Sequence, residues 1–483
     1  MGEKGRIFKN TIIYAIRQIM AVLFPLITFA YVSRVLGVEK IGVVNYAHSI
    51  TTYFVILSGL GISTYAIRVG AQKRDNEEEI NQFVSEVFTI NLISTIISLL
   101  VYLVIVFSFD SLKSYRSMLI AFSLLIPFTT LGIEWVYNIY EDFLYITVRS
   151  IVFQFLSLIL LFTFVRSAED AFVYACITVF ATVGSNVLNF IHSRKYIKLN
   201  SLALSSRLKH HIQPVILLFG MTIATTLYTN MDTTMLGAMC GDYQVGLYSA
   251  AHRITKIIVQ TLAVVRTVSL PALARHTKDH DEDEAFIELG SGVLGAILLV
   301  SIPIAVAVAC TADVILTIFS GAAFLEAAPT LRLLAVDILL SVLSGTLIYQ
   351  YVLLKKGEKS AFWITASGAI ANLVMNYIFI RAFASSGAAL ATCISELIVS
   401  FLAFSISKQY MNLKSVIRQI LLGGLGSIII IAFTFAARIV FGNAIIPILA
   451  SLILAGITFA GVLIKLKNNC VYEVITSYMN KRR

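Results

Sequence analysis

Apolar residues along the chain gather in runs of about 20 or more, with short polar segments between them. Because a bilayer core needs about 20 apolar residues per helix, the pattern predicts fourteen membrane-spanning helices. They lie at residues 10–33, 41–66, 83–108, 117–138, 144–165, 171–192, 213–238, 244–270, 287–310, 330–354, 360–382, 386–407, 417–438 and 444–464. The first run contains Arg17 and is too long and too polar for a cleaved signal, so it predicts a permanent helix.

Composition agrees with a membrane class. Apolar residues make up 58% of the 483 residues and charged residues 13%, with a mean hydropathy of +0.86. Soluble domains hold roughly 45–50% apolar and about 25% charged residues. The sequence therefore excludes a disordered chain and a large soluble catalytic domain, and predicts an all-α polytopic membrane protein.

The positions of the charges predict the orientation. The net charge is +10, but the basic residues stand in short clusters between apolar runs, so they indicate membrane topology rather than nucleic-acid binding. With the N-terminus cytoplasmic, 25 Lys and Arg residues face the cytoplasm and 7 the opposite side. This bias predicts a multi-pass membrane protein with both termini cytoplasmic. The five cysteines are scattered, with no disulfide or metal spacing.

The chain contains signs of an internal duplication. Gly42 to His48 matches Gly246 to His252 at an offset of 204, and Ala175 to Thr178 matches Thr392 to Ser395 at 217. Leu36-Gly37 pairs with Leu236-Gly237 in the same scheme. We expect a six-helix N-lobe at 1–200, a six-helix C-lobe at 201–412 related to it by a pseudo-twofold axis along the membrane normal, and two further helices with a basic cytoplasmic tail at 413–483.

One stretch carries a family resemblance: Val32-Ser-Arg-Val-Leu-Gly37, then Gly42-Val-Val-Asn-Tyr-Ala, then Gly59-Leu-Gly61. It resembles the opening of the Wzx-type O-antigen and capsule-unit flippases, in the polysaccharide branch of the multidrug/oligosaccharidyl-lipid/polysaccharide (MOP) exporter superfamily. The resemblance implies a non-enzymatic, monomeric transporter of undecaprenyl-diphosphate-linked oligosaccharides by alternating access. It also implies membrane lipids, a polysaccharide polymerase and a chain-length regulator as partners.

Cationic residues inside predicted helices are the candidate substrate site, since an ionisable group at membrane depth needs a reason. Arg17 shares a helical face with Tyr14 and Gln18, while Arg253 and Lys256 are three residues apart on the eighth helix. Arginines on the first and eighth helices of the related lipid II flippases attract the diphosphate, which by resemblance implies the same role for Arg17 and Arg253. A snorkelling Arg17 is the alternative. His48 and His252, related by the repeat, are either titrating groups of this site or packing residues.

Candidates for ion coupling are fewer. Asp232 lies on the seventh helix, Asn372 and Asn376 on the eleventh, and Thr392 on the twelfth. Oxygen ligands of this kind suit a small cation or a proton relay, and sodium-linked members of the superfamily use a similar arrangement. The sequence therefore predicts no cofactor, with Na⁺ or H⁺ as the coupling ion. Ordinary interhelical hydrogen bonding is the alternative. Arg332, Asp337 and Glu396 are expected to form a structural ionic cluster.

Several chemistries lack their motifs. No GxxxxGK[ST], GxSxG or HExxH sequence is present, and the extracytoplasmic loops are too short for a glycan polymerase. Two alternatives to the flippase stay open at this point. One is a cation-coupled multidrug exporter of the same superfamily, which needs a site of opposite charge. The other is a non-transporting scaffold for glycosyltransferases.

Overall fold

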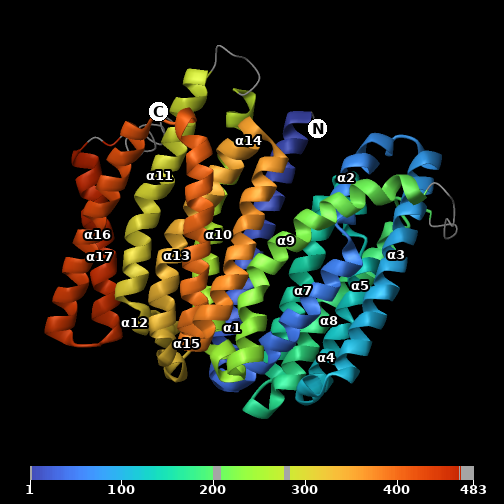
Figure 1. Cartoon of the computed structure of the whole chain (residues 1–483), viewed down its shortest axis with the longest axis horizontal. Helices are drawn as coiled ribbons and strands as arrows, with labels where there is room; N and C mark the ends of the chain where they lie inside the picture. Colours follow the sequence, from blue (N-terminus) through green and yellow to red (C-terminus); the bar gives the residue numbers. More distant parts are fainter. Residues whose placement is uncertain (1–2, 199–207, 277–282, 467, 469–483) are drawn as a thin grey trace. The chain divides into compact units, whose positions relative to one another are not determined.

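The computed structural model describes residues 3–198, 208–276, 283–466 and 468, and every regular element in those ranges is a helix (Figure 1). The chain divides into two compact units, residues 1–246 and 247–483. The predicted basic tail after Lys465 falls almost entirely outside the described residues. The predicted lobe boundaries at 200 and 412 were based on internal sequence similarity. The division into two compact units does not test that similarity, so these boundaries stay a prediction.

Within the described residues, the first unit contains nine α-helices and two short 3₁₀ helices, followed by the first turn of the next helix. In chain order they are α1 (Glu3–Gly59), α2 (Ile62–Lys73), α3 (Glu77–Ser108), the 3₁₀ helix η1 (Asp110–Tyr115), α4 (Arg116–Ser123), α5 (Leu125–Leu131), α6 (Glu134–Ile139), α7 (Phe143–Phe164), η2 (Ala168–Asp170), α8 (Ala171–Ser193) and α9 (Leu208–Cys240).

The second unit takes up most of α10 (Asp242–Arg275) and the rest of the chain. Its other elements are α11 (Asp283–Cys310), α12 (Ala312–Phe319), the 3₁₀ helix η4 (Ala322–Ala327), α13 (Ala328–Leu347), the π-helical turn η5 (Ile348–Val352), α14 (Leu353–Lys356), α15 (Glu358–Ser407), η6 (Lys408–Tyr410), α16 (Leu413–Phe441) and α17 (Ile445–Lys465). Helix α11 packs against both α13 and α16, and α16 against α17 (Figure 1).

The predicted polytopic helical fold is confirmed. Among the described residues, eleven helical segments are long and apolar enough to cross a membrane. Two of them, 23–73 and 358–410, each hold two predicted spans, joined where Gly37 (φ 75°) and Ala384 (φ 48°) leave helical geometry. Helix α9 covers the seventh predicted span. Each predicted span therefore consists mostly of helical residues, in one helix or in several.

The fourth predicted span, expected as one helix over 117–138, is instead broken into α4, α5 and α6. Pro127 explains the first break, because proline lacks an amide hydrogen and its ring crowds the carbonyl four residues earlier. That carbonyl belongs to Ser123, where α4 ends. The second break is at Ile133, whose φ of 33° is left-handed.

Backbone conformation adds a further pair of matching glycines to the predicted repeat. Gly37 and Gly241 both have positive φ, 75° and 83°, at the start of a new helical segment, where glycine is favoured. Their offset is 204, the same as for Gly42 and Gly246. The predicted pairing of Gly37 with Gly237 is therefore wrong: Gly237 lies inside α9, packed against the ring of Tyr46.

Two glycines bring helix α1 and the start of α10 into backbone contact. A Cβ on Gly42 would clash with the backbone carbonyl of Asp242, whose carbon would be 2.6 Å away. A Cβ on Gly246 would clash in the same way with the carbonyl of Val38, whose carbon would be 2.8 Å away. The contact is reciprocal, since Val38 and Asp242 are also 204 residues apart. Two repeat-related segments thus cross each other symmetrically.

Candidate functional site

The predicted substrate-binding residues of the first helix are only partly described. Arg17, Tyr14 and Gln18 lie on α1, but their side chains are outside the described part of the chain. Their role stays a prediction.

The cationic residues of the eighth predicted span lie on α10. Arg253 is partly buried and Lys256 is exposed. His252 stacks on Tyr248, one helical turn earlier, with ring centroids 5.5 Å apart and planes 11° from parallel. His252 thus has an aromatic neighbour, while Arg253, the next residue, and Lys256, about one turn further along the helix, carry positive charge.

His48 lies on α1, with its ring edge-on to Phe122 at 5.2 Å. The residue is exposed. Its match to His252 is a match in sequence, and both histidines have an aromatic neighbour. Their shared role in the substrate site stays a prediction.

A further cation of α10, Arg266, has a partner that the sequence did not indicate. Its guanidinium lies 4.8 Å from the centroid of the Tyr349 ring, in the π-helical turn η5. Any side chain at Gly345 would collide with that guanidinium. The nearby Gln350 amide donates to the Ser269 hydroxyl at 2.7 Å. Arg266 therefore helps to hold α10 against the end of α13.

The predicted coupling residues are buried. Asp232 on α9 is 3% exposed, and Tyr53 of α1 lies within its electrostatic reach. The Tyr53 and Thr234 hydroxyl oxygens are 3.0 Å apart, and the Thr234 hydroxyl donates to the Ser49 hydroxyl oxygen at 3.1 Å. The hydroxyl groups of Tyr53, Thr234 and Ser49 thus form a hydrogen-bonded chain in the neighbourhood of Asp232.

The other three predicted coupling residues belong to α15 in the second unit. Asn372 and Asn376 are fully buried, and the Asn376 amide donates to the Asn372 carbonyl oxygen at 2.9 Å. Thr392 donates to the Ala388 carbonyl oxygen at 3.0 Å. Whether these residues and Asp232 act as one site stays a prediction. A metal-type group of three or more His, Cys, Asp or Glu side chains is not found within the described ranges.

The acidic residues of the expected ionic cluster have hydroxyl donors. Glu396 accepts from the Ser344 hydroxyl at 2.5 Å, and Asp337 accepts from Ser341 at 3.1 Å. Both carboxyl groups are buried. The bond from Ser344 to Glu396 joins α13 to α15, whereas the bond from Ser341 to Asp337 lies within α13.

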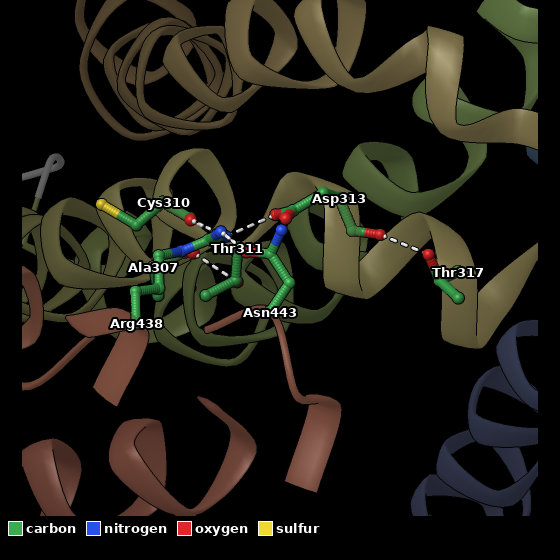
Figure 2. Close-up of polar contacts among 7 residues, drawn as sticks. All are labelled: Ala307, Cys310, Thr311, Asp313, Thr317, Arg438 and Asn443. Atoms are coloured by element: carbon green, nitrogen blue, oxygen red, sulfur yellow. Dashed lines mark hydrogen bonds and ion pairs between the residues drawn. The ribbon is translucent and has the colours of Figure 1, made fainter. Parts of the chain in front are cut away.

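Within the second unit, an ion pair ties the end of α16 to the junction of α11 and α12 (Figure 2). The Arg438 guanidinium donates to Asp313 at 2.6 Å and to the Cys310 carbonyl oxygen at 3.0 Å, and it also reaches Asn443 at 2.7 Å. Burial opposes ionisation of Asp313, but the hydrogen bond and charge of Arg438 lower its pKa overall.

The first unit contains a buried polar group that the sequence did not predict. Glu86 of α3, Tyr65 of α2 and His211 of α9 are hydrogen-bonded together and are each less than a tenth exposed. The available signal was Glu86 itself, an acid three residues inside a predicted span. His211 gave no such signal, because it lies in a segment assigned to the cytoplasm.

The comparison with known families decides the identity. The family model described as "Polysaccharide biosynthesis protein" matches residues 7–277. The chain belongs to this family. It is 22% identical over 272 residues to a putative O-antigen transporter of Escherichia coli, a match that covers 55% of this chain and 64% of that one. It is 23% identical over 262 residues to a probable low-salt glycan biosynthesis flippase of Haloferax volcanii, covering 54% of each.

The match therefore spans between half and two thirds of those relatives. Among solved structures, a lipid II flippase MurJ in an inward closed conformation has the same fold, with a TM-score of 0.75 and 15% identity. That likeness covers 94% of this chain and 99% of the other. The resemblance seen in the sequence is confirmed for family and fold.

Proposed function

We propose that this protein moves an undecaprenyl-diphosphate-linked oligosaccharide repeat unit, of an O-antigen, capsule or exopolysaccharide, across the bacterial cytoplasmic membrane. The observation that carries the proposal is the family match over residues 7–277. The named relatives, a putative O-antigen transporter and a probable glycan flippase, support it, as does the fold shared with a lipid II flippase. Both termini are proposed to be cytoplasmic.

The physical task suits a polytopic helical membrane protein. The polyprenyl tail stays in lipid, while the charged diphosphate and the sugar hydroxyls must cross about 30 Å of hydrocarbon. Cationic side chains replace the water around the diphosphate, and arginine can bind phosphate oxygens bidentately. Arg253 and Lys256 of α10, with Arg17 of α1, are the proposed ligands. Rocking of one lobe against the other then changes the side of access.

Transport against a gradient needs an energy source. One charge moved across 100 mV yields about 2.3 kcal/mol, which shifts a two-state equilibrium roughly fiftyfold. We propose that Na⁺ or H⁺ supplies it, with Asp232 as the main ligand and Asn372, Asn376 and Thr392 contributing oxygens. The partly buried hydroxyl groups of Tyr53 and Thr234, near Asp232, support this part of the proposal.

A complementation assay tests the function. In a strain that lacks its own flippase, the wild-type chain should restore surface polysaccharide, and Arg253→Ala should abolish it with the protein still present in the membrane. Arg253→Lys should restore it in part, because a point charge lacks the planar guanidinium fork. Arg194→Ala, an exposed arginine at the end of α8, is the matched control and should complement fully.

The same assay separates the other candidates. Full export by Arg253→Ala together with Arg17→Ala would contradict the diphosphate site. A chain that leaves lipid-linked units on the inner face but confers resistance to cationic drugs would instead be a multidrug exporter. A chain that restores polysaccharide without moving lipid-linked oligosaccharide in liposomes would be a scaffold. The polymerase and chain-length regulator are proposed partners downstream of the flippase.

A further inference from the structure

One arginine of the second unit has an aromatic partner but no hydrogen-bond acceptor within the described part of the chain. The guanidinium of Arg266, on α10, lies 4.8 Å from the centroid of the Tyr349 ring in η5. Among the described residues, no carboxylate is within ion-pair distance of this guanidinium, and no oxygen accepts from its N–H groups. A guanidinium has five N–H donors in a planar fork, so the group can still bind a ligand.

The π-helical turn holds Arg266 in place through two consecutive residues. The ring of Tyr349 lies against the guanidinium, while the fully buried Gln350 donates to the Ser269 hydroxyl at 2.7 Å and to the Arg266 carbonyl oxygen at 3.4 Å. Gly345, one helical turn before Tyr349, leaves room for the side chain, whose Cζ atom would be 3.2 Å from a Cβ at that position. The arginine is therefore positioned by its neighbours, and its N–H groups keep their capacity for hydrogen bonding.

The surface around Arg266 is apolar and open. Val264, Val265 and Val268 of α10 are all exposed, Val268 at 75%, and Tyr349 is also exposed. Arg266 itself is partly buried between them and η5. Exposed valines on a membrane-spanning helix are suited to contact with acyl chains, so a lipid can reach the guanidinium.

The depth of Arg266 matches the level of the lipid phosphates. Arg266 is about eight residues past the midpoint of the 34-residue α10, which is about 12 Å along the helix axis. With α10 centred in the membrane, the hydrocarbon ends about 15 Å from the midplane, so the backbone of Arg266 lies just inside it. A long arginine side chain can extend from there to the headgroup region.

Phosphate is the ligand that this arrangement suits best. A guanidinium at the edge of the hydrocarbon is costly without a partner of opposite charge. Two oxygens of a phosphate match the guanidinium fork, and the negative charge attracts the cation. Because Tyr349 already restricts the side chain, less conformational freedom is lost when the phosphate binds. An anionic lipid therefore supplies the acceptors that the protein does not.

We propose that Arg266, positioned by Tyr349, binds the phosphate group of an anionic lipid at this end of α10. The site is distinct from the proposed ligands of the diphosphate, since Arg266 is 13 residues from Arg253, about 20 Å along the helix. The phosphate comes from a membrane phospholipid or from a polyprenyl diphosphate, and the experiment separates these two sources. Only the second source rests on the proposed flippase function.

A tryptophan in place of Tyr349 can report which lipid occupies the site, because it keeps an aromatic face for the cation. The full-length protein carries Tyr349→Trp, with Trp135→Phe and Trp363→Phe to remove its two own tryptophans, and is reconstituted in phosphatidylcholine vesicles. Lipids with brominated chains quench tryptophan on contact, so quenching compares phosphatidylglycerol with phosphatidylcholine. We expect phosphatidylglycerol to bind about fivefold more tightly, and Arg266→Gln to remove the preference.

A glycine variant tests the site without changing any charge. The methyl group of Gly345→Ala would displace the guanidinium, which is the movable end of a long side chain, and should remove most of the preference. Gly424→Ala, with no atom within 4 Å of its Cβ, is the matched control. Arg275→Gln removes an exposed cation from the end of the same helix. Both controls should keep the preference of the parent protein.

Two results would overturn the site. One is an unchanged preference in both Arg266→Gln and Gly345→Ala. The other is an equal loss in Arg275→Gln, which would indicate a general attraction of anionic lipids. Native mass spectrometry repeats the test with the natural tryptophans, in case the tryptophan-free background misfolds. Wild-type protein should keep more bound phosphatidylglycerol than Arg266→Gln, and equal amounts would contradict the proposal.

Competition identifies the source of the phosphate. Polyprenyl diphosphate without bromine is added to vesicles that contain brominated phosphatidylglycerol, and the recovery of fluorescence is measured. Recovery at a mole fraction well below that of phosphatidylglycerol assigns the site to the diphosphate carrier, whereas recovery only at a similar or higher fraction assigns it to phospholipids. A protein that keeps the headgroup preference but flips no lipid would contradict the flippase function alone. A flippase without the preference would overturn this site alone.

Discussion

Adding one methyl group to the crossing of α1 and α10 should destabilise the protein by a measurable amount. In Gly42→Ala the new Cβ would lie 2.6 Å from the carbonyl carbon of Asp242, against about 3.5–4.0 Å for an ordinary carbon contact. The two backbones must therefore separate by about 1 Å. Overpacking of this kind costs about 1–3 kcal/mol, and alanine returns up to about 1 kcal/mol of helix propensity.

We expect a net loss of about 1–2 kcal/mol from Gly42→Ala and a similar loss from Gly246→Ala. Thermal unfolding in detergent measures it, at about 2–4 °C for each kcal/mol. The double variant should lose little more than either single one, because both methyl groups push the same backbones apart. Gly59→Ala, at the end of α1 with no atom within 4 Å of its Cβ, should cost nothing. Unchanged melting of both single variants, or fully additive losses, would refute the crossing.

Further predictions concern an ion pair and a helix cap. A double-mutant cycle on Arg438 and Asp313 should give a coupling of about 1–2 kcal/mol at pH 7, between the values for exposed and buried pairs. Since the pKa of Asp313 is lowered in the folded state, this stability is present above the unfolded value of 3.8 and is lost as the pH falls through the folded value. Coupling that does not weaken at any pH below 3.8 would contradict it. Asn76→Ala should lower the free energy of unfolding by about 0.5–2 kcal/mol in chemical denaturation, because the Asn76 side chain accepts hydrogen bonds from the Glu78 and Glu79 amides at 3.1 and 3.2 Å. Asp75→Ala, at a side chain that is 98% exposed, is the control and should leave the stability unchanged.

The helices could be predicted from the sequence because a membrane span is a local property. About 20 apolar residues suffice to identify one, and each predicted span consists mostly of helical residues, although some are divided among several helices. Breaks within spans needed more detail. Pro127 ends α4 through the carbonyl four residues before it, a rule that was available from the sequence. Ile133 carries no such signal, because its left-handed φ depends on packing around it.

The polar contacts could not be predicted in the same way. Glu86 and His211 are 125 residues apart in the chain, and the sequence around either residue does not predict that the two are in contact. Gly42 and Gly246 were found as a repeat, but only the structure shows that they cross each other. Gly237 misled the alignment because a Leu-Gly pair is common, whereas the positive φ of Gly241 identifies the true counterpart of Gly37. Long-range contacts therefore came from the structure, and spans from the sequence.

Direct measurement of lipid flipping tests the central claim. Purified protein is reconstituted with a polyprenyl-diphosphate-linked oligosaccharide, and an enzyme or lectin outside the vesicles reports how much of the glycan is accessible over time. The account predicts that the wild-type chain and Arg194→Ala make the inner pool accessible, while Arg253→Ala and protein-free vesicles do not. Equal accessibility for Arg253→Ala and wild type would contradict the cationic site, and no increase over protein-free vesicles for the wild-type chain would contradict the flippase itself.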